Sequence, residues 1–315
     1  MTISAGVDVG GTKILGVAID DEDPGTIVAE QRLATPEAED AVLDAMAEII
    51  GKLGADVSAV GVGIAGLVDR TGVLHASPNL PHMLGVDMAA EIQRRIGGLP
   101  VRVDNDATCA AWGEHVAGAG RGSNDVLMVT LGTGIGSGLI SDGELVRGAH
   151  GFGGEAGHMV VDAHGPPCPC GRWGCWERFA SGSGLARLGR DAAAAGRLER
   201  AKELAGGESW LVKGEHVTEA ARAGDPQALA LLETFAGWVA LGIGNLVTVL
   251  DASLVVVGGG IIELGDLLLD PVRAALPGHL MCPNERSELR IVPAELGPRA
   301  GAIGAAMLGL RGPSR

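Results

Sequence analysis

Basic residues are scarce in this chain of 315 residues, which has 24 Lys and Arg against 39 Asp and Glu and a formal charge of −15. This acidic balance argues against a surface whose main task is to bind a polyanion, so we do not expect nucleic acid as a partner. A small phosphorylated ligand is not excluded, because backbone N–H groups and a metal ion hold phosphate locally whatever the net charge.

Long apolar runs and export signals are missing as well. No run approaches the ~18 apolar residues of a membrane span. Residues Met1 to Ala5 lead directly into an apolar strand pattern, without the basic region and cleavage site of a signal peptide. We therefore expect a cytoplasmic protein with no membrane partner.

Glycine, in contrast, is abundant, with 52 residues in a chain where the usual share is ~7%. Many backbone positions are therefore expected to need positive φ or close approach to a ligand. Two glycine-rich turns, Gly10–Thr12 and Gly132–Gly134, each join two β-type runs at an offset of 122 residues. The recurrence predicts a duplicated domain.

The length, at ~150 residues per domain, predicts two domains. We place an N-terminal α/β domain at 1–118 and a larger C-terminal α/β domain at 119–299. Apolar residues at helical spacing predict helices at Ala107 to about Val116 and at Ala228–Leu250. A last Gly/Ala-rich helix at about 300–310 is expected to pack back on the N-terminal domain.

Both glycine turns present groups that bind phosphate: N–H donors without side chains in the way and a hydroxyl. The first turn adds an ammonium group, and a carboxylate at the end of the preceding strand to hold Mg²⁺ or its waters. The alternative for each is a plain hairpin turn. Two facing turns of this kind would hold one polyphosphate chain. The residues are Asp8, Gly10, Gly11, Thr12, Lys13, Gly132, Thr133 and Gly134.

Other nucleotide motifs are absent or incomplete. The sequence has no G-x-x-x-x-G-K-[ST] segment, and Gly61–Gly66 matches G-x-G-x-x-G but continues as strand and turn, not as helix. We therefore expect no dinucleotide site, although Gly66 could approach a ligand. A second glycine run follows a fully apolar strand and offers bare backbone to a ring or ribose, or is only a flexible connection: Gly258, Gly259 and Gly260.

Three polar residues, Asp104 to Asp106, lie between a predicted strand and a predicted helix. Asp106 could simply accept the free N–H groups at the start of that helix. In the functional interpretation, Asn105 binds a substrate hydroxyl and Asp106 accepts its proton during phosphoryl transfer.

Five cysteines are too few for a disulfide scaffold, and three of them fall within eight residues. With one histidine they provide a complete set of four N/S ligands for a closed, structural Zn²⁺ site: His158, Cys168, Cys170 and Cys175. Unmetallated thiols are the alternative. Glu155 and Glu177 flank these residues and suit vicinal hydroxyls, as does Asn79, although ordinary surface charge and a turn residue are the alternatives.

These motifs together resemble the ROK family (repressors, open reading frames and kinases) of sugar kinases, over almost the whole chain. The segment 168–177 is the most specific of them. The resemblance implies an actin-like, ribonuclease H-like α/β fold in which two domains surround a cleft. It places the nucleotide and the small zinc-binding segment on the C-terminal domain.

The resemblance also implies a role for each matching residue. Asp106 would be the base for the sugar 6-hydroxyl, and His158 would hold zinc with one ring nitrogen and face the sugar with the other. The other hydroxyls would be bound by Asn79, Asn105, Glu155 and Glu177. ATP and Mg²⁺ would be held by the two phosphate turns and backed by Gly258 to Gly260.

The implied activity is ATP-dependent phosphorylation of a hexose, with glucose favoured. N-acetylmannosamine, N-acetylglucosamine and fructose stay open as substrates, and polyphosphate as donor. A repressor is not expected, because only seven residues precede Asp8. The non-enzymatic alternative is a sugar-binding regulator that has lost catalysis. The family also implies self-association, as a homodimer or homotetramer.

Overall fold

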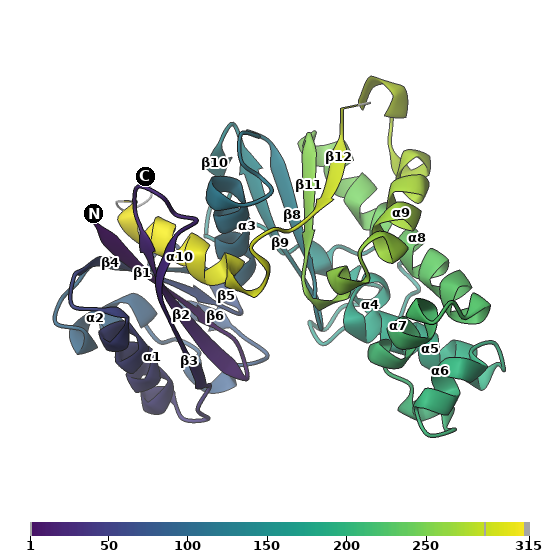
Figure 1. Ribbon diagram of the computed structural model, residues 1–315, viewed down its shortest axis with the longest axis horizontal. Helices are drawn as coiled ribbons and strands as arrows, with labels where there is room; N and C mark the ends of the chain where they lie inside the picture. The colour runs from purple at the N-terminus through teal and green to yellow at the C-terminus, as the bar shows by residue number, and fades with distance from the viewer. Residues whose placement is uncertain (1, 287, 312–315) are drawn as a thin grey trace. The chain divides into compact units, whose positions relative to one another are not determined.

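The chain passes four times between two units, which the computed structural model describes over residues 2–286 and 288–311 (Figure 1). Unit 1 consists of Met1–Met128, Gly138–Gly154 and Ala294–Arg315, and unit 2 of Val129–Ser137 and Glu155–Pro293. Segment 138–154 thus groups with unit 1, whereas the sequence analysis left it in the C-terminal domain. The division at 118 and 299 into functional domains stays a prediction.

A mixed five-stranded sheet forms the centre of unit 1, in the order β3-β2-β1-β4-β7. β2 pairs antiparallel with β1, and β3 pairs antiparallel with β2. On the other side β4 pairs parallel with β1, and β7 pairs parallel with β4. The carboxyl ends of β1, β4 and β7 therefore meet at one edge of the sheet. A small hairpin of β5 and β6 follows β4. The strands are β1 Ile3–Val9, β2 Lys13–Asp20, β3 Ile27–Ala34, β4 Val57–Ile64, β5 Leu67–Val68, β6 Leu74–Ala76 and β7 Val101–Asn105.

Different helices cover the two faces of this sheet, because successive side chains of a strand point to opposite faces. Val7 and its neighbours on β1 pack in one apolar cluster with α1 (Glu39–Leu53) and α2 (Met88–Arg95). Val17 on β2 packs in another with α10 (Ala300–Leu310). α3 (Asp106–Ala117) lies against the outer side of α10 (Figure 1). The last helix thus contacts β1, β2 and β4 of this sheet.

Backbone lies unusually close to backbone around α10. A Cβ atom on Gly6 would be 1.8 Å from the carbonyl oxygen of Ala302, and one on Gly61 would be 1.7 Å from that of Ala305. On the other side, a Cβ on Gly304 would be 1.7 Å from the carbonyl oxygen of Cys109. Part of the glycine content is therefore explained by helix packing rather than by ligands.

The second sheet repeats the strand order of the first, as β10-β9-β8-β11-β12. β9 and β10 form an antiparallel pair, and β11 and β12 a parallel pair. A hairpin start followed by two later strands on its other side occurs in both sheets, so the predicted duplication is confirmed. The strands are β8 Val126–Leu131, β9 Ile135–Ser141, β10 Glu144–Leu145, β11 Leu254–Gly258 and β12 Arg290–Pro293.

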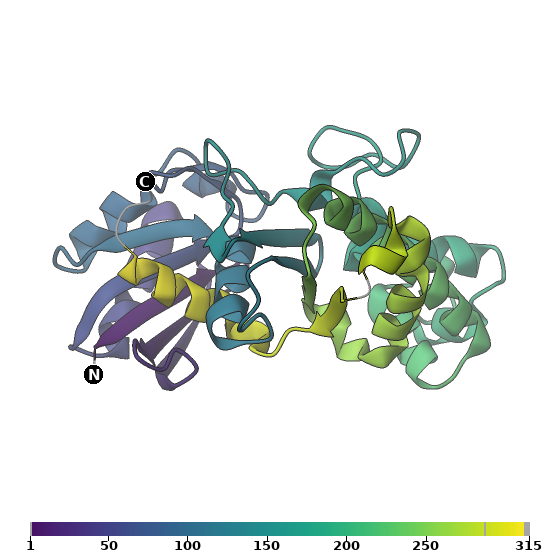
Figure 2. The same ribbon diagram turned by 90° about the horizontal axis from the view of Figure 1, so that it is seen from above.

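Helices make up most of unit 2 and lie beside one another in both views (Figure 1, Figure 2). α8 is their centre and packs against α4, α5, α7 and α9. The helices are α4 Glu177–Ala180, α5 Gly182–Ala194, α6 Glu199–Leu204, α7 Gly214–Arg222, α8 Pro226–Leu250 and α9 Asp266–Ala275.

α8 is also longer and more apolar than the sequence analysis allowed for. An 18-residue stretch of it reaches a mean hydropathy of 1.5, which by length and composition alone would suffice to cross a membrane. Half of that stretch is buried inside the structure, with Phe235, Val239 and Ile243 fully covered. Because the core helix of a globular domain passes the same test, this is weak evidence for a span.

Candidate functional site

The first glycine turn joins β1 to β2 and lies at the surface of unit 1. The N–H of Gly10 donates to the carbonyl of Lys13 at 3.0 Å, and Gly11, Thr12 and Lys13 are exposed. A Cβ atom on Gly11 would be 2.9 Å from Cβ of Asn79, so Asn79 lies directly against this turn. The turn thus has bare backbone, a hydroxyl and an ammonium group within one exposed loop, as phosphate binding requires.

Two carboxyl groups interact beneath this turn. Burial and the carboxylate of Asp106 raise the pKa of Asp8 to about 7, against the opposing effect of Lys13. A Cβ on Gly301, in the first turn of α10, would be 3.0 Å from Cγ of Asp8, so the helix begins close to this carboxyl group. Two neighbouring carboxylates that are withdrawn from water favour a shared proton or a bound cation.

Asn105 and Asp106 stand where β7 ends and α3 begins. Asn105 is the N-cap of α3: its Oδ1 accepts the N–H of Thr108 at 3.0 Å. The sequence analysis weighed this capping role for Asp106, which instead is the first residue of the helix and accepts the N–H of Ala107 at 2.9 Å. Burial raises the pKa of Asp106, while the N–H groups and Asn105 oppose the shift.

The amide of Asn105 is largely occupied within unit 1. Its Nδ2 donates to the carbonyl of Gly66 at 3.1 Å and to Oδ1 of Asp106 at 3.1 Å. Both of its N–H bonds and one Oδ1 lone pair are then used. Asn105 thus connects Gly66, Asp106 and the start of α3 through hydrogen bonds. One lone pair of its Oδ1 is left for a substrate hydroxyl.

Asp104 and Arg147 support this loop, and the sequence analysis assigned them no role. Asp104 Oδ2 accepts Nε of Arg147 at 2.5 Å, while Asp104 Oδ1 accepts the N–H of Asn105 at 2.9 Å. Both side chains are nearly buried. Asp104 could have been noticed because it belongs to the polar run Asp104 to Asp106. Nothing in the sequence links Arg147 to that run.

The second glycine turn joins β8 to β9 in unit 2. Gly132 accepts the N–H of Gly182 at 2.7 Å through its carbonyl, which attaches the turn to the start of α5. Gly259 has a φ of +86°, and a Cβ there would be 2.5 Å from the backbone of Leu131. The glycine run Gly258–Gly260 therefore lies on the end of β8, next to the turn.

Glu177 lies beside the same turn, at the start of α4. A Cβ on Gly134 would be 2.8 Å from Oε2 of Glu177, and Oε1 of Glu177 is 3.1 Å from the Sγ of Cys168. Unit 2 therefore brings together the second turn, the glycine run and a carboxylate next to the cysteine cluster.

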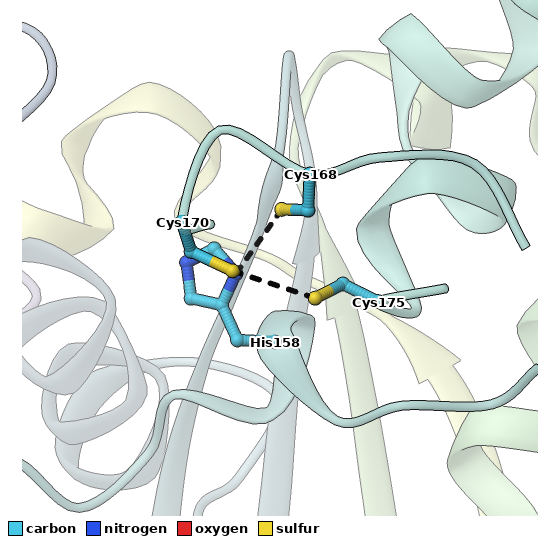
Figure 3. Close-up of side chains that lie close together, drawn as sticks. All are labelled: His158, Cys168, Cys170 and Cys175. Atoms are coloured by element: carbon cyan, nitrogen blue, oxygen red, sulfur yellow. Dashed lines mark hydrogen bonds between the residues drawn. The ribbon is translucent and has the colours of Figure 1, made fainter. Parts of the chain in front are cut away.

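The cysteine cluster gathers four ligand atoms from His158, Cys168, Cys170 and Cys175 within 4.8 Å of one another (Figure 3). The Sγ of Cys168 is 3.7 Å from Nδ1 of His158, and the two other sulfurs are 3.6 Å apart. Ligands at ~2.3 Å around a tetrahedral Zn²⁺ would be about 3.8 Å from each other. The residues therefore fit a zinc ion in number, type and spacing.

The two ring nitrogens of His158 face different neighbours. Nδ1 points into the cluster, while Nε2 is 4.0 Å from Oε2 of Glu155. One nitrogen is thus placed for a metal and the other lies beside a carboxylate, while the predicted contact of His158 with a sugar stays a prediction. Gly174 closes the loop with a φ of +68°, where a Cβ would be 1.6 Å from the carbonyl oxygen of Asp162.

The predicted site residues thus fall into two groups, one in each unit. The group in unit 1 consists of Asp8, Gly10, Gly11, Thr12, Lys13, Gly66, Asn79, Asn105 and Asp106. The group in unit 2 consists of Gly132, Thr133, Gly134, Glu155, His158, Cys168, Cys170, Cys175, Glu177, Gly258, Gly259 and Gly260. The roles given to these residues stay predictions.

Known proteins resemble the chain over nearly its full length. The ROK family profile matches residues 4–311. A glucokinase of Streptomyces coelicolor is 38% identical over 313 residues, 98% of each chain. A glucokinase of Thermotoga maritima is 34% identical over 307 residues, 96% of each. Among solved structures, a ROK family glucokinase of Streptomyces griseus in complex with glucose and AMPPNP has a TM-score of 0.85 at 38% identity, covering 98% of this chain and 100% of that one.

Proposed function

The chain belongs to the ROK family, and on that premise we propose that it transfers the terminal phosphoryl group of ATP to the 6-hydroxyl of a hexose, with glucose as the preferred acceptor. The glucokinase likeness at 38% identity over 98% of the chain supports the activity. The structural likeness to a ROK glucokinase in complex with glucose and AMPPNP supports the substrate pair.

Asp106 is the general base in this proposal. It stands at the end of a strand and the start of a helix, and Asn105 and Ala107 hold its Oδ1 in one orientation. Because the pKa of Asp106 is raised by burial, the carboxylate is a better proton acceptor than one in water. In phosphoryl transfer, Asp106 contributes mainly by orienting the attacking hydroxyl and by accepting its proton, and less by making that hydroxyl a stronger nucleophile.

The nucleotide phosphates are assigned to the two glycine turns. Lys13 and Thr12 add charge and a hydroxyl to the first turn, and Thr133 adds a hydroxyl to the second. Gly258 to Gly260 lie next to the second turn and back the nucleotide with bare backbone. Asp8 is assigned to Mg²⁺, because this cation prefers oxygen ligands and its charge would offset the repulsion between Asp8 and Asp106.

The sugar hydroxyls are assigned to Asn79, Asn105, Glu155, His158 and Glu177. Three of these, Glu155, His158 and Glu177, belong to or touch the zinc cluster. A bound Zn²⁺ supplies structure rather than chemistry here, because four protein ligands leave no open position. The cysteine loop would thereby hold the two glutamates in one arrangement.

The observation that carries the proposal is that Asp8 and Asp106 lie at neighbouring strand ends next to an exposed glycine turn. Asp8 pairs with Gly63 on β4, and a Cβ atom on Gly63 would be 3.5 Å from Cα of Asp106. The test is a coupled assay of the purified protein with Mg²⁺ and either ATP or polyphosphate. The acceptors are glucose, fructose, N-acetylmannosamine and N-acetylglucosamine, and the product is identified as the 6-phosphate.

We expect the highest kcat/KM for glucose with ATP. A higher value for another sugar or for polyphosphate would replace the substrate named here. No transfer to any acceptor, with the protein folded and zinc-loaded, would favour the sugar-binding regulator. The same proposal includes self-association as a homodimer or homotetramer, which light scattering tests. It also includes the cytoplasmic location and the domain division at 118 and 299.

A further inference from the structure

Thr35 lies directly after β3, next to the first glycine turn, and the sequence analysis assigned it no role. Its Oγ1 donates to the carbonyl of Gly10 at 2.7 Å, and its N–H donates to the carbonyl of Thr12 at 3.1 Å. One residue at a neighbouring strand end thus holds the turn at two points. Gly10 and Thr12 are both residues that the proposed function assigns to the nucleotide phosphates.

The pairing of β2 with β3 brings Thr35 to this place. Lys13 pairs with Ala34 in that antiparallel ladder, so the next two residues, Thr12 and Thr35, also face each other. Pro36 follows and disfavours the helical region for the residue before it, which keeps Thr35 extended. The N–H bond of Thr35 therefore continues the sheet, whereas its hydroxyl bond is an additional contact that depends on the side chain.

The hydroxyl bond sets the direction of an N–H group in the turn. In a trans peptide, the C=O of one residue and the N–H of the next lie in one plane and point in opposite directions. The bond from Thr35 to the carbonyl of Gly10 therefore directs the N–H of Gly11 away from Thr35. Within residues 2–286 and 288–311, no hydrogen bond uses the N–H of Gly11 or of Thr12. Both groups can thus donate to an anion, as in the backbone concavities that bind phosphate.

Other support for the turn is sparse. Its residues Gly11, Thr12 and Lys13 are exposed, so burial does not fix their conformation. The hydrogen bond within the turn runs from the N–H of Gly10 to the carbonyl of Lys13 at 3.0 Å. A loop that is ordered only when its ligand binds loses affinity to the entropy cost, and a loop that is held beforehand avoids this loss.

We propose that Thr35 is a positioning residue for nucleotide binding. Its hydroxyl holds the first glycine turn in the conformation that receives the phosphates of ATP. This inference rests on the proposed function and extends it to a residue outside the two groups of predicted site residues.

The test compares variants of the full chain. Thr35→Val removes the hydroxyl and keeps the branched shape, and Thr35→Ser keeps the hydroxyl. Thr26→Val is the matched control, because Thr26 lies directly before β3, at the other end of the strand, and its hydroxyl donates to Asp23 at 2.6 Å. Steady-state kinetics give KM for ATP and for glucose separately, and calorimetry gives the Kd of AMPPNP with Mg²⁺ and of glucose without turnover.

We expect Thr35→Val to raise KM for ATP and Kd for AMPPNP about three- to tenfold, as loss of one hydrogen bond implies, with less than about a twofold change for glucose. Thr35→Ser and Thr26→Val should keep the wild-type values. Melting temperatures report whether each variant is folded, and Thr35→Ala replaces Thr35→Val with the same expectations if that variant folds poorly.

A purely structural role for Thr35 predicts a lower melting temperature with unchanged affinity for AMPPNP, and that result would overturn the inference. An equal loss of affinity in Thr26→Val, or no rescue by Thr35→Ser, would overturn it as well. If the wild type binds AMPPNP but phosphorylates no sugar, the proposed function fails, while the Kd values still decide the role of Thr35. A wild type that binds no nucleotide would overturn both.

Discussion

The turns after β1 and β8 occupy equivalent places in two sheets of the same strand order, yet they differ in side-chain charge and in the contacts that hold them. The turn of unit 1 is exposed and surrounded by side-chain charge, with Asp8 and Asp106 beneath it and Lys13 at its end. The turn of unit 2 has no charged residue of its own and is fixed by backbone contacts to Gly182 and Gly259. The two sheets thus share one strand order, while the first turn combines bare backbone with side-chain charge and the second has bare backbone without a charged residue of its own.

The proposed function accordingly depends on side-chain charge at the first turn and on backbone shape at the second. Substitutions of charge should therefore act on catalysis when made in unit 1, whereas insertion of a methyl group or removal of the metal should act on unit 2.

The largest effect is expected for Asp106→Ala. Loss of a general base should reduce kcat by about 10²- to 10⁴-fold, while circular dichroism and melting temperature stay close to the wild type. Asp23→Ala, an exposed carboxylate in the β2–β3 turn of the same unit, is the control and should leave kcat unchanged. Phosphorylation by Asp106→Ala at a near-normal rate would remove this residue from the mechanism.

The next effect is expected for the zinc cluster. Cys175→Ser removes a fully buried ligand, so bound zinc measured by mass spectrometry should fall from about one per chain to near zero. Because Glu155 and Glu177 then lose their support, KM for the sugar should rise about tenfold or more. Cys282→Ser alters an exposed cysteine outside the cluster and should retain both metal and KM. Full zinc content in Cys175→Ser would contradict the assignment.

A smaller effect separates the two turns directly. Gly259→Ala places a methyl group 2.5 Å from the backbone of Leu131 at a φ of +86°, so unfolding free energy should fall by about 2–4 kcal/mol. Gly10→Ala meets only the carbonyl oxygen of Lys13 at 3.4 Å and should cost less than about 1 kcal/mol. Chemical denaturation of both variants gives the comparison, and equal losses would refute the contrast between the turns.

The last effect develops only as pH changes and concerns the stability contributed by Asp8. The pKa of Asp8 is about 7 in the folded chain and ~3.9 in an unfolded one, so the native state binds the proton more tightly. The stability that this proton confers is complete below about pH 4 and is lost as pH rises through 7. Asp8→Asn cannot ionise, and its unfolding free energy relative to wild type, measured in EDTA, should rise by up to about 4 kcal/mol between pH 4 and pH 8.

Added Mg²⁺ should reduce that difference, because the cation stabilises the ionised wild-type carboxylate and has no such ligand in the variant. A difference that is constant with pH would show that Asp8 titrates as an ordinary carboxyl group.

Local sequence patterns carried most of the fold. The two hairpins, α3, α8 and the strands before each glycine run follow from the spacing of apolar residues and glycines, which is local information. Within each unit, strand ends and turns also explain why neighbouring site residues lie close together, while their roles stay predictions. Asp106 accepts a free N–H group at the start of α3, as expected, but the N-cap role of Asn105 was not predictable, since either side chain can cap a helix and only the backbone conformation decides.

Long-range polar contacts stayed hidden for another reason. Glu114 is fully buried and accepts the N–H groups of Ala119, Glu295 and Leu296, yet in the sequence it is one acidic residue in an apolar helix. Arg147 is equally inconspicuous, although it supports Asp104 from 43 residues away. Such pairings depend on tertiary packing, which a single sequence does not encode in any local spacing.

The position of α10 constrains how the molecule is made. The inner layer of unit 1 comes from residues 300–310, so a ribosome has translated all of unit 2 before the first sheet can cover its second face. Until then Leu15, Val17 and Ile19 lack the contacts of α10, and the nascent N-terminal half exposes an apolar surface of the kind that chaperones recognise. The N-terminal part of unit 1 can therefore complete its core only after α10 has been synthesised.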